Sequence, residues 1–149
     1  MNDAAHDRNR FVEAQRDIYA QALAELRAGR KRSHWMWFVF PQIAGLGSSA
    51  MACRYTIRDL DETRAYLNHP ILGVRLRDCA EALLAIEGRS AREILGSPDD
   101  LKLCSIATLF AQVSPPGSVF HRLLERYCGG KPDRLTLERL SAGSRHDER

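Results

Sequence analysis

The feature that most constrains this chain is its division into short amphipathic segments that end at glycine or proline. Apolar residues recur at steps of three and four from Phe11 to Leu26, a spacing that predicts one amphipathic helix closed by Gly29 as its C-terminal cap. A stronger apolar stripe predicts a second helix from Pro70 to Gly88. Helices therefore dominate the expected fold.

Capping residues and chain breakers place the remaining helical segments. These cover residues 59–69, 90–96, 98–112, 119–127 and 135–140. The pairs Asp59–Glu62 and Ser90–Glu93 have the spacing of capping boxes, in which the two side chains satisfy the first backbone N–H groups of a helix. Six or seven helices of such unequal length predict an all-α, single-domain, irregular multihelical bundle over residues 1–140. Residues 141–149 are polar and are expected to form a disordered tail.

An aromatic run at residues 35–40 is the most unusual segment. It contains both tryptophans of the chain, two phenylalanines and one methionine, and Pro41 follows directly. Its length fits either a buried strand or two turns of buried helix. We favour a helix with Ser33 as its N-cap.

The aromatic run has two interpretations. The first is a central core element packed on all sides, because large aromatic side chains dominate core burial. The second is a pocket wall in which Trp35 and Trp37 stack on the flat ring of a ligand. Both interpretations stay open at the level of sequence.

A glycine-bearing loop follows the run and adds to the second interpretation. Gln42, Gly45, Gly47 and Ser48 are candidate ligand-binding residues, since backbone amides near small residues can approach an anion. The spacing lacks the lysine of a P-loop and the third glycine of a dinucleotide fingerprint. The segment therefore predicts an anion contact but no known nucleotide motif.

Four polar residues complete the candidate site. His34 opens the aromatic run and Asp99 opens a helix, so both are candidate catalytic residues that could carry a proton. His69 and Lys102 are candidate ligand contacts, although His69 also fits as the boundary between two helices, because Pro70 follows it. We find no metal-ligand spacing and no nucleophile elbow, and we expect no metal and no cofactor.

Composition narrows the function classes further. The four cysteines stand about 25 residues apart, unlike zinc or redox pairs, so we expect reduced thiols. The net charge of +3 is dispersed apart from residues 30–32, which makes nucleic acid an improbable partner. No signal peptide or membrane span is apparent, and the cytoplasm is the expected location.

The run from His34 to Gln42, followed by Gly45–Ser48, resembles the signature of the bacterial family called domain of unknown function 1810. Further blocks agree with it, at residues 10–15, 66–76, 99–103 and 108–111. The resemblance covers nearly the whole chain and implies an almost all-α fold with no established activity. The stretch Cys104–Ala107 departs from the serine- and methionine-rich sequence expected there.

A shorter stretch is similar to the NADAR group, which processes NAD and ADP-ribose derivatives. It comprises Leu83–Leu84, Gly88, Glu93 and Ser97–Asp99, while the tryptophan–glycine pair of that group is missing after Asp99. This likeness leads to the hypothesis of a pocket protein that binds a nucleotide- or ADP-ribose-like molecule and hydrolyses an N-glycosidic bond. The alternative is a non-catalytic protein–protein interaction domain with the aromatic run in its core.

Overall fold

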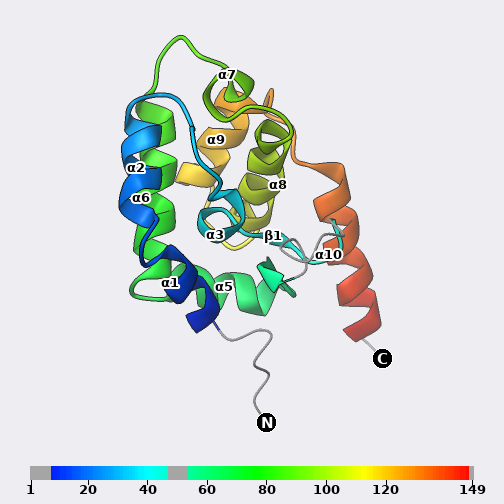
Figure 1. Cartoon of the computed structure of the whole chain (residues 1–149). Coiled ribbons are helices and arrows are strands. Elements are labelled where there is room, and N and C mark those ends of the chain that lie inside the picture. The colour runs from blue at the N-terminus through cyan, green and yellow to red at the C-terminus, as the bar shows by residue number, and fades with distance from the viewer. Residues whose placement is uncertain (1–7, 47–53, 148–149) are drawn as a thin grey trace.

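The computed structural model describes residues 8–46 and 54–147, the last five of them by their backbone only. Over these residues the chain forms helices and one small sheet (Figure 1). In chain order these are α1 (Asn9–Gln15), α2 (Tyr19–Arg27), α3 (Met36–Val39), β1 (Gln42–Ile43), β2 (Thr56–Ile57), α5 (Leu60–Asn68), α6 (Leu72–Ala85), α7 (Ala91–Leu95), α8 (Asp99–Ala111), α9 (Val119–Tyr127) and α10 (Arg134–Asp147). The predominantly helical prediction is confirmed. The predicted number of helices is too low, because the described residues alone form nine.

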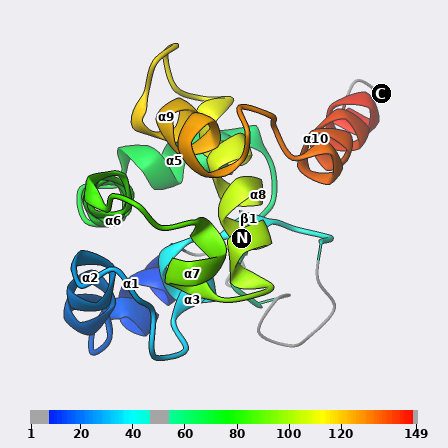
Figure 2. The ribbon, with the colours of Figure 1, turned by 90° about the horizontal axis from the view of Figure 1, so that it is seen from above.

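Helix α8 lies at the centre of the molecule, with α5, α7, α9 and α10 arranged around it (Figure 2). Its predicted apolar positions are buried, among them Leu103, Ile106 and Phe110. The Phe110 ring packs against those of Tyr66 and Phe120, with centroids 5.6 and 5.4 Å away. Most of α8 is buried, whereas its first turn is only partly buried. This first turn therefore lies at the edge of the core.

The single helix expected over residues 11–26 is wrong, because the chain turns at residues 16–18 and forms α1 and α2. No glycine or proline marks this break. Its cause is tertiary: α1 packs against α3, whereas α2 packs against α6. The Gln15 side chain is buried at the turn, where its Nε2 donates to the Phe38 carbonyl over 2.6 Å.

Most predicted helix ends are confirmed. Asp59 accepts a hydrogen bond from the Glu62 amide at the start of α5, and Ser90 and Glu93 form a complete capping box at α7. Gly29 has a φ of +82° and ends α2, as its position predicts. Ser33 does not cap α3, because the N-cap position is Trp35 and the Ser33 hydroxyl bonds elsewhere.

Strands β1 and β2 were not predicted and make the all-α assignment wrong in this detail. They pair in parallel, with Gln42 beside Thr56 and Ile43 beside Ile57. Gln42 was expected in a loop. A two-residue strand is too short to show the alternation that identifies strands in a sequence.

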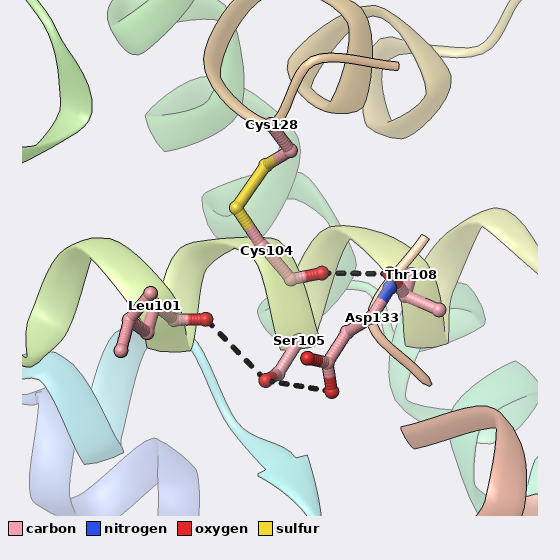
Figure 3. Close-up of a disulfide and its surroundings, with 6 residues drawn as sticks. All are labelled: Leu101, Cys104, Ser105, Thr108, Cys128 and Asp133. Atoms are coloured by element: carbon pink, nitrogen blue, oxygen red, sulfur yellow. Dashed lines mark hydrogen bonds between the residues drawn. A yellow bond between two sulfur atoms is a disulfide. The ribbon is translucent and has the colours of Figure 1, made fainter. Parts of the chain in front are cut away.

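The expectation of four reduced cysteines is also wrong. Cys104 of α8 and Cys128, directly after α9, form a disulfide with a Cα–Cα distance of 5.9 Å (Figure 3). Cys79 is a free, buried thiol, and burial raises its pKa to about 12. The sequence separation of 24 residues does not indicate a disulfide, because the packing of α8 against α9, rather than sequence proximity, brings the two sulfurs together.

Asp133 anchors the C-terminal helix next to the disulfide. Its Oδ2 accepts a hydrogen bond from Ser105 Oγ (Figure 3). The same oxygen accepts from the Thr136 amide and hydroxyl, while the Asp133 amide donates to Thr108 Oγ1. Helix α10 then continues to Asp147, beyond the residue 140 boundary expected from sequence. Within the described ranges, no helix is long and apolar enough to cross a membrane.

Candidate functional site

The two tryptophans of the aromatic run lie in different environments. Trp35 is 1% exposed, so its ring has no open face for a ligand. Its indole Nε1 donates to Glu25 Oε1 over 2.9 Å, and its ring packs near Phe40. Trp35 is a satisfied core residue.

Glu25 of α2 holds the segment that leads into the aromatic run. Its buried carboxylate accepts five hydrogen bonds, from Gln21 Nε2, the Arg32 and Ser33 amides, Ser33 Oγ and Trp35 Nε1. Burial alone would raise the pKa of Glu25, but these donors together lower it to about 2. The carboxylate therefore fixes residues 32–35 against α2.

Trp37, in contrast, is only partly buried and lies at the N-terminal turn of α8. The ammonium group of Lys102 stands 4.2 Å from the centroid of its ring. Lys102 Nζ also lies 3.4 Å from Asp99 Oδ1, and Lys31 Nζ lies 3.0 Å from Asp99 Oδ2. We call Lys31, Trp37, Asp99 and Lys102 the lysine–tryptophan cluster.

Three separate elements position the cluster. Asp99 and Lys102 are three residues apart on α8, which places them on one face of the helix. Trp37 comes from α3. Lys31 is held by its backbone amide, which donates to the Ile94 carbonyl of α7 over 2.7 Å.

The cluster carries more positive than negative charge in a partly desolvated place. The side chains of Lys31, Asp99 and Lys102 are 10%, 15% and 20% exposed. Two ammonium groups share one carboxylate, and Lys31 also stands 5.4 Å from the centroid of the Trp35 ring. Each Asp99 oxygen faces one ammonium group, so Asp99 is the shared counter-ion of both lysines.

Two of the predicted site residues, His34 and His69, make no hydrogen bond or ion pair with this cluster. His34 is exposed. The His69 Nδ1 accepts hydrogen bonds from the Ile71 and Leu72 amides over 3.1 and 3.2 Å. His69 therefore stabilises the start of α6, the structural role that its position before Pro70 suggested.

The loop residues lie on the α10 side of the molecule. Gln42 is half-buried in β1, and Gly45, with a φ of +99°, lies against the Arg139 guanidinium. Arg139 Nε donates to the Ala44 carbonyl over 3.3 Å. Gly47 and Ser48 lie outside the described residues. Among the residues that are described, no three His, Cys, Asp or Glu side chains gather as a metal site would require.

Two residues that matter here were missed by sequence reasoning. Lys31 belongs to the basic triplet 30–32, which is typical of a solvated helix end, and only its neighbours in space distinguish it from Arg30 and Arg32. The burial of Glu25 could have been predicted, because Glu25 lies three residues after Ala22 and next to Leu26 on the apolar face of α2. A carboxylate at such a position predicts buried partners.

The fold and the cluster together define a small, predominantly helical protein with a tryptophan-flanked ion-pair cluster at one end of its central helix. The chain belongs to the family described as "Protein of unknown function (DUF1810)", whose model matches residues 5–140. This confirms the family predicted from the aromatic run. The match supplies no activity, and the likeness to the NADAR group stays a prediction.

A solved structure supports the same fold. The chain is similar to the conserved hypothetical protein Rv1873 from Mycobacterium tuberculosis, known from a crystal structure at 1.38 Å. The two are 53% identical, the match covers 91% of this chain and 96% of that one, and the TM-score is 0.88. No protein of curated function matches the chain.

Proposed function

We propose that this protein binds a small anionic, nucleotide-like molecule at the lysine–tryptophan cluster and does not hydrolyse it. The observation that carries the proposal is the charge ratio of the cluster, in which Lys31 and Lys102 share the single carboxylate of Asp99 at 10–20% side-chain exposure. A desolvated ammonium group without its own counter-ion is costly, and an anionic ligand would remove that cost.

The surroundings of the cluster favour an anion with a flat ring. The exposed Arg30 and Arg32 flank Lys31 and add positive potential, which would attract an anion from solution. Trp37 keeps part of its indole exposed beside Lys102, so a planar group could pack there while a phosphate contacts the ammonium. A phosphate next to an aromatic ring is the chemistry of a nucleotide.

Binding without hydrolysis follows from the state of the two predicted catalytic residues. Asp99 is paired with both lysines, and among the described residues no hydrogen bond or ion pair joins it to the exposed His34. A general base needs a free oxygen or nitrogen within hydrogen-bond reach of the substrate. We therefore restrict the proposal to recognition and leave out the N-glycosidic cleavage.

The experiment is thermal unfolding of the protein in the presence of pyrophosphate, AMP, ADP-ribose or adenosine. A ligand that binds the folded state at 100 times its Kd stabilises it by about 2.7 kcal/mol. We expect AMP or ADP-ribose to raise the Tm saturably and adenosine, which lacks a phosphate, to leave it unchanged. Pyrophosphate should act more weakly because it lacks the ring.

Two variants and one control assign the effect to the cluster. Lys31→Met and Lys102→Met keep the apolar stems but remove the ammonium groups, and each should abolish the Tm increase. Lys131→Met changes an exposed lysine after α9 and should leave the increase intact. If no anion raises the Tm, or if Lys102→Met responds like the unmodified protein, the proposal is wrong and the interaction-domain alternative takes its place.

A further inference from the structure

A groove between α2 and α6 shares no residue with the lysine–tryptophan cluster. The two helices run side by side, as both views of the ribbon show (Figures 1 and 2). At the C-terminal end of α2 the surface is hollowed by about 410 Å³. Small residues explain the hollow, because Ala28, Gly29, Ala82 and Ala85 line it.

The walls of the groove carry opposite charges. Arg27 comes from the last turn of α2, whereas Asp78 and Glu81 come from α6. Arg89 lies at the end near Gly29, where a Cβ built on Gly29 would be 3.7 Å from Arg89 Nε. The groove therefore presents guanidinium groups on α2 and beside Gly29, and carboxylates along α6.

Three of these charges have no ion-pair partner in the described part of the chain. Arg27, Asp78 and Arg89 are exposed, and among the described residues none of them makes an ion pair or a side-chain hydrogen bond. Glu81, in contrast, faces Arg122 with an N–O distance of 3.9 Å. The small residues of the floor leave the hollow unfilled, so the exposed Arg27 and Asp78 are available to a molecule that spans the groove.

We propose that this groove binds a small zwitterion with a carboxylate and an ammonium group, the chemistry of a short peptide or free amino acid. The carboxylate would pair with the Arg27 and Arg89 guanidinium groups, which offer several N–H donors in a planar fork. The ammonium group would pair with Asp78, and the alanine floor would contact the backbone of the ligand. The volume of about 410 Å³ lies within the usual range for small-ligand sites.

The test is a titration of the ¹⁵N-labelled protein with diglycine, followed by the amide shifts of residues 27–29 and 78–89. We expect saturable shifts confined to these residues. N-acetyl-diglycine, which lacks the ammonium group, and diglycine amide, which lacks the carboxylate, should bind at least about tenfold more weakly. If acetate alone shifts the same amides with equal affinity, the zwitterion proposal is overturned.

Variants separate the groove from general surface charge. Arg27→Gln and Asp78→Asn should each weaken diglycine binding about tenfold, and Ala85→Leu should block it by filling the hollow without changing charge. Arg30→Gln and Glu87→Gln alter exposed charges that do not line the groove, and they should bind as the unmodified protein does.

The lysine–tryptophan cluster is read out separately, through nucleotide-induced Tm changes. The two proposals can therefore fail independently. Absence of any saturable shift with diglycine at the groove overturns this one.

Discussion

Trp35, the N-cap residue of α3, and Trp37, inside α3, stand two residues apart, yet they belong to different parts of the molecule. Trp35 is 1% exposed and gives its indole N–H to the buried Glu25 carboxylate. Trp37 is partly exposed and lies under the Lys102 ammonium at the edge of α8. The aromatic run therefore combines a core element and a surface cluster, although sequence presents these as competing interpretations.

The geometry of α3 explains this division. Successive helical residues are rotated by about 100°, so positions 35 and 37 point in nearly opposite directions. One direction leads to α2 and the other to α8. Substitutions at the two positions should therefore have different effects. The stability of the fold should depend on Trp35, and binding of the proposed anionic ligand should depend on Trp37.

The largest expected effect comes from truncating the sealed tryptophan. Trp35→Ala should lower the free energy of unfolding by about 3–5 kcal/mol, because it leaves a large cavity and removes a donor from Glu25. Trp37→Ala should cost less than about 2 kcal/mol, since part of that ring is already in water. Urea denaturation of both variants measures the difference, and equal losses would contradict the division of the aromatic run.

The disulfide offers a second comparison, between the two flanks of α8. One flank holds ion pairs to Asp99, whereas the other is joined covalently to the end of α9. Replacing Cys104 and Cys128 together with alanine should cost about 3 kcal/mol, because the link closes a chain segment of 24 residues.

A thiol reductant tests the same link without a mutation. It should lower the urea midpoint of the unmodified protein and leave that of the double variant unchanged. An unchanged midpoint in the unmodified protein would mean that the link does not stabilise the fold.

The pH dependence of stability sharpens the role of Glu25. The pKa of Glu25 is lowered from 4.5 to about 2 in the folded protein. Its contribution to the free energy of unfolding is therefore fully present above pH 4.5 and is lost as the pH falls toward 2. We expect this loss to be about 3 kcal/mol and to be absent in Glu25→Gln.

Glu93 provides the matched control for this titration. Its pKa is also lowered, by hydrogen bonds from Ser90, but its carboxylate is exposed at the start of α7. Glu93→Gln should therefore keep most of the acid-induced loss of stability between pH 4.5 and pH 2. Parallel curves for Glu25→Gln and the unmodified protein would show that the buried carboxylate is not the group responsible.

The smallest effect on stability should come from the cluster itself. Lys102→Met removes an ion pair and a cation–π contact that are each worth about 1 kcal/mol or less, and it keeps the apolar stem. The free energy of unfolding should therefore change by less than about 1 kcal/mol while anion binding is lost. A much larger loss of stability would instead make Lys102 a structural residue.

Sequence reasoning predicted the helices where local signals decide their ends. Asp59, Ser90 and Gly29 act as caps in the places where they were expected. It failed at the break between α1 and α2, at the two short strands and at the disulfide, because each depends on contacts between distant segments. No periodicity or spacing reports on such contacts.

The candidate site shows the same limit. Trp37, Asp99 and Lys102 were predicted and do come together, since α3 and the first turn of α8 meet at the edge of the core. Lys31 was not predicted, because a basic triplet after a helix is ordinarily solvated. His34, predicted as catalytic, is exposed, and His69, predicted as a ligand contact, accepts hydrogen bonds from the Ile71 and Leu72 amides.

The most direct test of the central claim is quenching of each tryptophan by iodide and by caesium. Trp35→Phe leaves Trp37 as the only indole, and Trp37→Phe leaves Trp35. We predict that iodide quenches Trp37 more strongly than caesium does, that AMP protects it, and that neither ion reaches Trp35. Equal quenching of Trp37 by both ions with no protection by AMP, or ready quenching of Trp35, would contradict a cationic ligand site beside a sealed core.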